Sequence, residues 1–344
     1  MSSATPLRIL ISDAARASVA ARLALAMGDR PHILVPGGEW SLPDPGVHIA
    51  FVSRDVTGLS TKHEVLPDTQ RFYDALLKST GVRWVHVHSA GADRPVYQTL
   101  IQRGVQVTTS PGANAGVVAQ TALAGVLSLA RKFPQLVAAQ RERRWAPLIG
   151  TGLPRDLAGQ TAVVVGWGAV GQRLGALLVA VGLKVVAVRR SAAVRDVADD
   201  TAGSATGTSG VETITFEDLA TALPRADWLL LACPLSDTTR GLINAQTLAC
   251  LPEGAHLVNV ARGEVVDEPA LVASLQSGKL AGAYLDVFAH EPLKPQSPLW
   301  QLPNVIVTPH SAGFSDGNAP KVEQMFLDNL AKWLAGEPLL NPAS

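Results

Sequence analysis

The chain has 344 residues, of which 47% are hydrophobic and 17% charged, and Lys+Arg and Asp+Glu both total 29. A chain of this length exceeds what one hydrophobic core usually serves, and at about 150 residues per domain it predicts two domains. The balanced charge excludes the net electrostatic field that draws a protein onto nucleic acid or an anionic membrane.

Residues 7–109 alternate short apolar runs with helical patterns. The runs LRILI, HILV, HIAFV, RWVHV and VQVT predict strands, and residues 68–79 and 95–103 predict helices. This alternation is typical of a parallel sheet covered by helices, and we expect it to form the first domain. Residues 54–70 make a longer connection than usual, which we interpret as a solvated loop.

A helical pattern then runs over residues 114–144, with an interruption at Pro134. Its first part, residues 115–130, is apolar, but it contains polar residues and falls short of the roughly 20 residues that a membrane-spanning helix needs. We therefore expect a buried helix, and the whole stretch leads from one domain to the other.

Cysteine usage and the start of the chain indicate a compartment. Cys233 and Cys250 are too few for a disulfide framework or a metal cluster, which is typical of a reducing environment. The segment MSSATPLRILISDAAR has no basic region before an apolar core, so it does not resemble a signal peptide. We expect a cytoplasmic protein with no metal ion and no membrane or nucleic-acid partner.

A second series of strand and helix patterns begins at Thr161. The near-continuous apolar runs TAVVV, LKVVAV, DWLLLACP, AHLVNVA, LAGAYLDVF and NVIVTPH predict strands that helices cover on both faces. Residues 195–213 are rich in Ala, Thr, Gly and Ser and predict a surface loop. Residues 321–336 predict a last amphipathic helix that ends at Gly336 and packs on the first domain.

The motif GWGAVG follows the first of these strands and opens a helix. Its glycines, Gly166, Gly168 and Gly171, suit a tight turn, a close approach of the pyrophosphate to the backbone, and close packing of the helix. Ala169 and Val170 lie between them, at the helix N-terminus, where positive potential favours phosphate. The motif in this context predicts a dinucleotide site, and an ordinary glycine turn is the alternative.

The strand after this helix ends at Arg189, Arg190 and Ser191. An acidic residue there would hold the ribose 2′-hydroxyl of NAD, whereas guanidinium groups attract the 2′-phosphate of NADP. The sequence thus favours NADPH. Two solvated arginines at a strand tip, with NAD still bound, remain the alternative.

Three reactive side chains follow three of the predicted strands: Arg262, Glu291 and His310. Ligands of an open α/β sheet bind at the carboxyl ends of strands. Together the three supply a cation for a carboxylate, a proton donor for a carbonyl oxygen and a carboxylate that keeps this donor charged, which reduction of a 2-keto acid requires. Taken singly, each has a structural alternative: a surface arginine, a turn glutamate, and a histidine bonded to backbone.

The surrounding motifs resemble those of the NAD(P)-dependent D-isomer-specific 2-hydroxyacid dehydrogenase family. They are GWGAVGQRLG, CPLSDTTRGLIN, LPEGAHLVNVARGEVVDEPAL, LAGAYLDVFAHEPL and NVIVTPHSAG, and the resemblance covers roughly residues 82–335. It implies an α/β fold of two Rossmann-like, doubly wound parallel-sheet domains. Residues 1–112 with 314–344 would form a flavodoxin-like substrate domain, and residues 113–313 a dinucleotide-binding Rossmann domain inserted into it.

By this resemblance Arg262 binds the substrate carboxylate and 2-oxo group, His310 protonates the oxygen as hydride arrives, and Glu291 keeps His310 protonated. Asp286 would face the nicotinamide carboxamide. Further cofactor contacts are implied for Val260, Ala261, Gly313, Cys233 and Pro234. For Cys233, a buried small hydrophobic side chain is the alternative.

The loop of Ser89, Ala90 and Gly91 resembles the family loop whose backbone amides bind the substrate carboxylate, and a plain strand-end turn is the alternative. His86 and His88, just before it, fit core or wall positions better than catalytic ones.

The resemblance implies reduction of a small 2-keto acid, glyoxylate or hydroxypyruvate, to the D-2-hydroxy acid with NADPH, or with NADH, and the reverse reaction. We also expect a homodimer. Trp145 resembles a tryptophan that in some members of the family reaches a neighbouring subunit's active site. Two alternatives stay open. One is a family member that acts on an aromatic 2-keto acid, formate or phosphite, and the other is a dinucleotide-sensing, corepressor-like binding protein.

Overall fold

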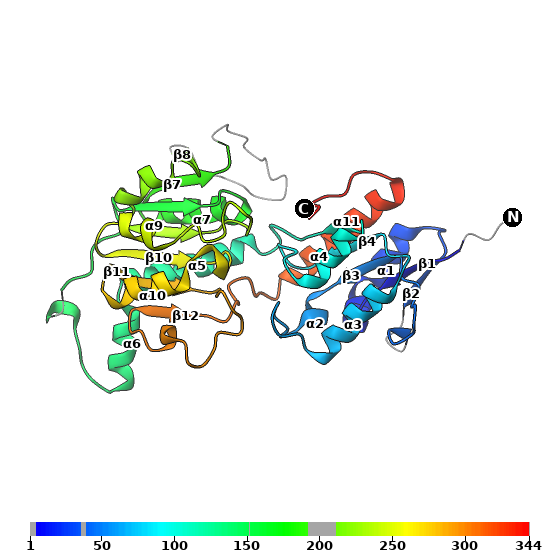
Figure 1. The fold of residues 1–344 in the computed structure, drawn as a ribbon, viewed down its shortest axis with the longest axis horizontal. Coiled ribbons are helices and arrows are strands. Elements are labelled where there is room, and N and C mark those ends of the chain that lie inside the picture. Colours follow the sequence, from blue (N-terminus) through cyan, green and yellow to red (C-terminus); the bar gives the residue numbers. More distant parts are fainter. Residues whose placement is uncertain (1–4, 36–38, 151, 192–210, 344) are drawn as a thin grey trace. The chain divides into compact units, whose positions relative to one another are not determined.

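A computed structural model describes residues 5–35, 39–150, 152–191 and 211–343 (Figure 1). The chain divides into two compact units, one made of Met1–Ala113 with Ser315–Ser344 and the other of Asn114–Phe314. The second unit is therefore inserted between the two parts of the first. Each unit is built on an all-parallel sheet, which confirms the predicted fold class.

The first unit has a five-stranded sheet in the order β2-β1-β3-β4-β5, which is the flavodoxin-like order. The strands are β1 (Leu7–Leu10), β2 (His32–Val35), β3 (Ile49–Val52), β4 (Trp84–Val87) and β5 (Gln106–Thr108). The five apolar runs of the sequence form these strands. A parallel sheet that helices cover on both faces buries its central strands, and every residue of β3 and β4 is buried.

Helices pack on both faces of this sheet: α1 (Asp13–Met27), α2 (Arg54–Thr57), α3 (Pro67–Lys78), α4 (Pro95–Gln102) and α11 (Asn318–Ala335). One hydrophobic cluster lies under α1 and α11, and another lies under α3 and α4. The last helix thus returns to the first unit and ends at Gly336 in a left-handed conformation, as the sequence predicts. The expectation of a solvated loop over residues 54–70 is wrong in part, because α2 forms there and Ser60 is buried against Thr69.

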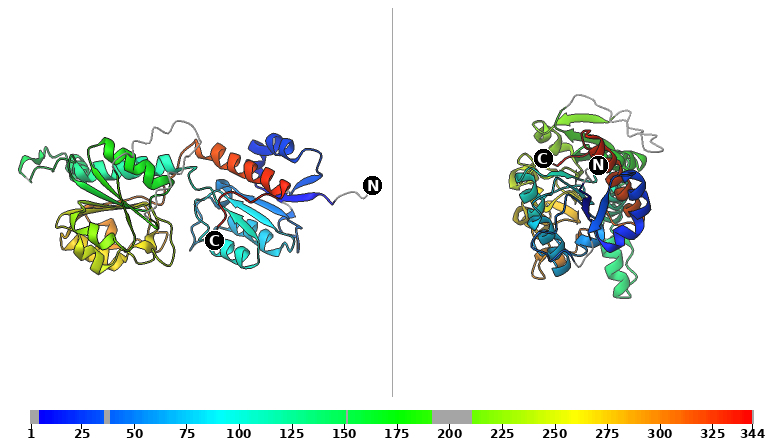
Figure 2. Two further views of the ribbon diagram at one scale, coloured as in Figure 1. Left: turned by 90° about the horizontal axis from the view of Figure 1, so that it is seen from above. Right: turned by 90° about the vertical axis from the view of Figure 1, so that its right-hand side faces the viewer.

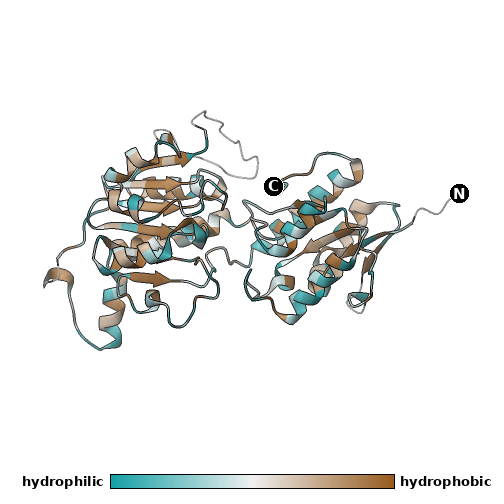
Figure 3. Ribbon diagram, viewed as in Figure 1, coloured by the Kyte–Doolittle hydropathy of each residue, from teal (hydrophilic) through white to brown (hydrophobic). Residues whose placement is uncertain are grey.

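The second unit has a seven-stranded sheet in the order β12-β11-β10-β9-β6-β7-β8. The order reverses between β6 and β9, which is the topological switch point of a Rossmann sheet. The strands are β6 (Thr161–Val165), β7 (Lys184–Arg189), β8 (Glu212–Thr215), β9 (Trp228–Leu231), β10 (Ala255–Asn259), β11 (Leu280–Leu285) and β12 (Val305–Val307). Figure 3 shows most strands as hydrophobic, in keeping with the apolar runs.

The helices of the second unit are α5 (Ala115–Ala130), α6 (Phe133–Arg141), α7 (Ala169–Ala180), α8 (Leu219–Ala222), α9 (Ala245–Cys250) and α10 (Glu268–Gln276). One hydrophobic cluster lies under α5 and α7, and another lies under α8, α9 and α10. In Figure 2 helices cover both faces of each sheet. The buried helix predicted over residues 115–130 is confirmed.

One predicted loop needs a correction. Residues 195–213 were expected to form a surface loop, but Glu212 and Thr213 belong to β8, which pairs with β7. The pattern ETIT is short and no more than half-buried, so its strand signal is weak. Residues 192–210 lie outside the described residues.

Among the helices that the structure describes, none combines the length and the apolar character of a bilayer-spanning segment.

Candidate active site

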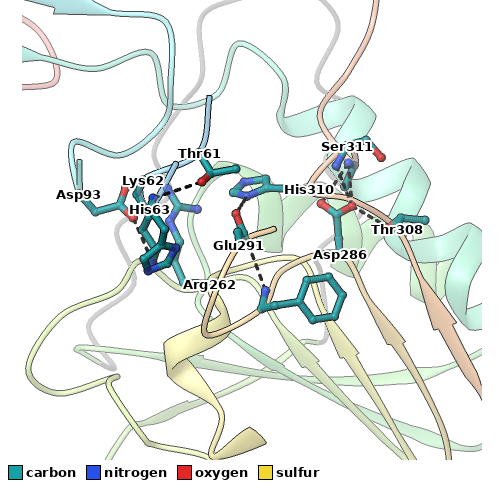
Figure 4. A network of polar contacts seen from close by, with 12 residues as sticks. Thr61, Lys62, His63, Asp93, Arg262, Asp286, Glu291, Thr308, His310 and Ser311 are labelled. Carbon is teal, nitrogen blue, oxygen red and sulfur yellow. Dashed lines mark hydrogen bonds and ion pairs between the residues drawn. The ribbon is translucent and has the colours of Figure 1, made fainter. Parts of the chain in front are cut away.

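Three loops at the carboxyl edge of the seven-stranded sheet carry the reactive side chains. Arg262 follows β10, Glu291 follows β11 and His310 follows β12. These strands are neighbours and run parallel, so their carboxyl ends lie at the same edge. The structure brings the three side chains to one side of the second unit (Figure 4).

His310 and Glu291 form a hydrogen-bonded pair. His310 Nδ1 lies 2.8 Å from Glu291 Oε2, and the Oε1 atom of the same carboxylate accepts the N–H of Phe288 at 3.1 Å. The Glu291 side chain is 12% exposed, whereas the His310 side chain is 49% exposed. Because an ionised carboxylate only accepts hydrogen bonds, the hydrogen on Nδ1 points at Glu291, and Nε2 is the nitrogen that exchanges a proton with a ligand.

The backbone at His310 is left-handed, with φ 50°, a conformation that residues other than glycine rarely adopt. The His310 N–H donates to the carbonyl oxygen of Asp286 at 2.8 Å. The Asp286 carboxylate is buried and accepts the N–H groups of Ser311 at 2.9 Å and Ala312 at 3.0 Å. Asp286 therefore stabilises the turn that presents the imidazole (Figure 4).

The turn at Arg262 depends on Asn259, which ends β10 and is buried. Asn259 Oδ1 accepts the N–H of Ala261 at 3.0 Å, and Asn259 Nδ2 donates to the carbonyl oxygen of Arg262 at 3.1 Å. The Arg262 side chain itself donates from Nη1 to the carbonyl oxygen of Ala261 at 2.8 Å. These hydrogen bonds stabilise the loop that carries the guanidinium, and Arg262 is half-buried.

The glycine motif makes the turn that its spacing predicts. Gly166 has φ 100°, and a Cβ there would lie 2.5 Å from the backbone nitrogen of Cys233. A Cβ on Gly171 would lie 2.0 Å from the carbonyl oxygen of Gly166, so the first turn of α7 touches the loop. At Gly168 a Cβ would meet nothing within 4 Å, so the backbone there faces open space.

Gly168 caps α7 without a side-chain hydrogen bond, and the N–H groups in the first turn of a helix have no intrahelical acceptor. Ala169 and Val170 thus present backbone donors at the positive end of the helix dipole. A pyrophosphate has the charge and size that this open, uncapped end accepts, and the residues present fit a dinucleotide. Trp167, between the glycines, packs back on α7, where a Cβ on Gly175 would lie 2.2 Å from its ring.

Arg189 is the last residue of β7 and is half-buried, and Arg190 and Ser191 follow it and are exposed. The strand lies beside β6, which carries the glycine motif. The two guanidinium groups therefore lie at the carboxyl edge next to the dinucleotide turn, where a ribose 2′-substituent is recognised in this fold.

The other residues predicted to contact the cofactor are Cys233, Pro234, Val260, Ala261 and Gly313. The thiol of Cys233 is buried in the core, and burial raises its pKa to about 11. Both observations favour the alternative that this side chain is a buried small hydrophobic group. Pro234 next to it is exposed. The remaining predicted residues keep their backbone near the carboxyl edge: Val260 and Ala261 after β10, and Gly313 after β12.

In the first unit, Ser89, Ala90 and Gly91 form a bend directly after β4. Ser89 Oγ donates to the carbonyl oxygen of Gly91 at 2.7 Å, and the Ser89 carbonyl oxygen accepts the N–H of Ser110 at 2.9 Å. Within the described residues, the N–H groups of Ala90 and Gly91 donate no hydrogen bond. The bend therefore has two backbone donors with which to bind an anion.

The interpretation of His86 as a core residue is confirmed, since it is fully buried. Trp84 Nε1 donates to Thr108 Oγ1 at 2.9 Å, and Thr108 Oγ1 lies 2.8 Å from His86 Nδ1. His86 Nε2 lies 3.0 Å from Ser110 Oγ, which donates to the carbonyl oxygen of Val87 at 3.0 Å. One neutral imidazole with its hydrogen on Nε2 satisfies this whole chain, and burial lowers the pKa of His86 to about 3.

Sequence reasoning missed the residues that support the three reactive ones. Asn259, Gly263 and Thr308 lie within the same motifs, yet their roles depend on contacts with other strand-end loops. The asparagine at a strand end was the one available signal, because its side chain commonly braces a turn. Among the described residues, no group of His, Cys, Asp and Glu forms a candidate metal site.

Comparison with known proteins matches this architecture. The sequence profile of the D-isomer specific 2-hydroxyacid dehydrogenase, NAD binding domain, matches residues 123–312. A glyoxylate reductase of Korarchaeum cryptofilum is 30% identical over 263 residues, which is 74% of this chain and 74% of that protein.

Two solved structures are similar over nearly the whole chain. A D-isomer specific 2-hydroxyacid dehydrogenase of Xanthobacter autotrophicus in complex with NADPH and MES has a TM-score of 0.74 at 29% identity, and covers 99% of this chain and 98% of its own. An NADPH-dependent glyoxylate/hydroxypyruvate reductase of Sinorhizobium meliloti in complex with NADP and sulfate also has a TM-score of 0.74, at 26% identity and with the same coverage.

Proposed function

The chain belongs to the D-isomer specific 2-hydroxyacid dehydrogenase family, and we propose that it reduces a small 2-keto acid of the glyoxylate or hydroxypyruvate type to the D-2-hydroxy acid with NADPH. The same site would catalyse the reverse oxidation. The observation that carries the proposal is the pair of His310 Nδ1 and Glu291 Oε2, 2.8 Å apart at the strand ends.

In this mechanism each of the three residues has one task. Arg262 binds the substrate carboxylate, and its fork of donors suits two carboxylate oxygens at once. His310 donates the proton on Nε2 to the keto oxygen, and takes it back in the oxidation. Glu291 accepts from Nδ1 throughout, so it fixes the ring orientation and stabilises the charged imidazolium.

The glycine turn and α7 would hold the dinucleotide through backbone N–H groups, with Arg189, Arg190 and Ser191 at the ribose 2′-phosphate. When bound, the nicotinamide supplies the hydride. Val260, Ala261, Asp286 and Gly313 would line its pocket. Asp286 Oδ2 accepts one hydrogen bond, from Ala312, so this atom keeps a lone pair for a carboxamide donor. The similar structures with NADPH and NADP support this choice of cofactor.

The substrate class is supported by the names of the relatives, which include glyoxylate reductase and glyoxylate/hydroxypyruvate reductase. The bend at Ser89, Ala90 and Gly91 would add backbone donors for the substrate carboxylate. Residues 1–112 with 314–344 would thus act as the substrate domain, and residues 113–313 as the dinucleotide domain.

We also propose that the protein is a cytoplasmic homodimer. Hydrophobic side chains are exposed along residues 133–153: Phe133 is 53% exposed, Trp145 95%, Ile149 81% and Leu153 73%. Exposed apolar stretches of this kind mark protein interfaces. The free thiols of Cys233 and Cys250 suit a reducing compartment. A monomer in analytical ultracentrifugation would refute the dimer.

The test is a substrate panel with NADH and NADPH in parallel. Glyoxylate, hydroxypyruvate and an aromatic 2-keto acid are each assayed for reduction by the full-length protein. Formate and phosphite are assayed for oxidation, with NAD⁺ and NADP⁺ in place of the reduced cofactors. We expect the highest kcat/KM for glyoxylate or hydroxypyruvate with NADPH. Tight dinucleotide binding without turnover of any acid would support a binding protein and contradict the proposal.

A further inference from the structure

The buried carboxylate of Asp286 receives a hydrogen bond from Thr308, a side chain to which the proposed function assigns no role. Thr308 Oγ1 donates to Asp286 Oδ1 at 2.6 Å, and Tyr284 Oη lies 2.7 Å from the same Thr308 Oγ1. The three residues come from β11 and from the end of β12, two neighbouring strands. They form a side-chain relay next to the His310 turn, and Figure 4 shows its link between Thr308 and Asp286.

The direction of this relay follows from counting hydrogens. A threonine hydroxyl has one hydrogen, and in Thr308 the Asp286 carboxylate accepts it. The hydrogen between Tyr284 and Thr308 must therefore come from the tyrosine. Burial raises the pKa of Tyr284 above its ordinary value, so the phenol keeps this hydrogen at neutral pH.

Packing holds Tyr284 in place at the start of the relay. Its side chain is buried, and a Cβ on Gly125 of α5 would lie 2.5 Å from Tyr284 Cγ. The glycine thus makes room for the ring against the helix. Because the ring cannot rotate away without a clash, its hydroxyl stays directed at Thr308.

At its other end the relay stabilises an unfavourable backbone. Asp286 binds the N–H groups of His310, Ser311 and Ala312 through its carbonyl oxygen and its carboxylate. These hydrogen bonds offset the energetic cost of the left-handed conformation of His310. If the carboxylate rotates, the N–H groups of Ser311 and Ala312 lose their acceptor. The turn then shifts, and the imidazole loses its alignment with Glu291.

We propose that Thr308 and Tyr284 are positioning residues for the proton transfer, because they orient the Asp286 carboxylate that holds the His310 turn. This inference rests on the proposed function of the site. Thr308 and Tyr284 touch neither substrate nor cofactor themselves, so their substitution acts through Asp286. It changes the position of His310, and it weakens the binding of NADPH by no more than the one carboxamide contact proposed for Asp286 Oδ2.

The experiment compares Thr308→Val, Thr308→Ser and Tyr284→Phe in the full-length protein. For Thr308→Val we expect kcat for glyoxylate to fall about 10- to 100-fold, as a misplaced catalytic group does, with an altered pH profile. The Kd for NADPH should rise by at most about 10-fold, the loss of one hydrogen bond. Thr308→Ser restores the hydroxyl and recovers most of the activity. Tyr284→Phe should lower kcat by roughly 3- to 10-fold, the loss of one hydrogen bond.

A matched control separates positioning from general stability. Thr247→Val removes a half-buried helix-capping contact at α9, far along the chain from the relay, and should lower Tm without a change in the pH profile. If Thr308→Val behaves like this control, with wild-type kcat and pH profile, the positioning role is wrong.

A readout without turnover keeps the inference independent of the substrate. In NMR spectra of the histidine rings, His310 is assigned by its absence in His310→Gln. We expect the His310 signals of Thr308→Val to move toward those of Glu291→Gln. Wild-type His310 signals in Thr308→Val would overturn the inference, whereas an inactive wild-type protein in the acid panel would overturn the proposed function alone.

Discussion

A Cβ atom on Gly263 would lie 1.8 Å from the carbonyl carbon of Phe288. The loop that carries Arg262 and the loop that carries Glu291 are therefore in direct backbone contact, and only glycine permits this approach. Phe288 also donates its N–H to Glu291. This backbone contact therefore fixes the distance between the loops that carry Arg262 and Glu291.

Gly263→Ala should separate these two loops. Because the added methyl meets backbone, which cannot rotate away, we expect a loss of about 1–3 kcal/mol in the free energy of unfolding and a fall in kcat/KM of about 10- to 100-fold. Gly317→Ala, at an exposed position with no atom closer than 3.8 Å, is the control. Urea unfolding and steady-state kinetics measure both effects, and a variant as stable and active as the control would contradict the contact.

Glu291→Gln keeps the shape of the side chain and removes its charge. The amide no longer fixes the hydrogen on His310 Nδ1 or stabilises the imidazolium, so kcat should fall by about 10²- to 10⁴-fold. The Kd for NADPH should not change, since Glu291 lies away from the glycine motif along the sheet edge. Glu337→Gln, in a surface ion pair with Lys332, is the control. Unchanged kcat in Glu291→Gln would show that the pair has no catalytic role.

Arg189→Ser with Arg190→Ser should change the cofactor preference. Hydrogen bonds from guanidinium to phosphate contribute about 1.5–3 kcal/mol each, so we expect KM for NADPH to rise at least about 10-fold. KM for NADH should change little, because NADH has no 2′-phosphate. Arg30→Ser with Arg103→Ser, two exposed arginines of the first unit, controls for the loss of two positive charges. Equal changes in the two KM values would mean that these arginines do not recognise the phosphate.

His86 predicts a pH dependence of stability. Its pKa is about 3 in the folded protein, against 6.5 for the free residue, so its contribution is complete above pH 6.5 and is lost as the pH falls toward 3. At pH 5 the free energy of unfolding should be about 2 kcal/mol lower than at pH 7.5 from this residue alone. His86→Gln should flatten the dependence in urea titrations at the two pH values. An equally steep dependence in that variant would contradict a buried neutral imidazole.

The strands and the reactive residues could be predicted because their signals are local. Buried parallel strands are near-continuous apolar runs, and the glycine turn lies within six residues of sequence. The edge strand β8 has no such run, and helix α1 is rich in alanine with weak amphipathic character, so neither stands out. Pattern reading fails where one face of an element is not clearly distinguished from the other.

The supporting contacts could not be predicted for a different reason. Thr308 and Asp286 are 22 residues apart in the chain, and Gly125 precedes Tyr284 by many more. Such contacts depend on the order of strands in the sheet and on side-chain directions, which no local pattern encodes. The position of Arg262, Glu291 and His310 at strand ends could be predicted from the sequence. The hydrogen bonds and close packing contacts that hold these residues there are visible only in the structure.

The most direct test of His310 as the proton donor is the rate of NADPH oxidation by His310→Ala with glyoxylate or hydroxypyruvate, whichever acid the wild-type protein reduces better. If His310 donates the proton, kcat should fall by about 10²- to 10⁴-fold, while NADPH binding, followed by its fluorescence, keeps the wild-type Kd. A variant that binds NADPH and retains wild-type turnover would contradict the assignment of the proton donor and the mechanism built on it.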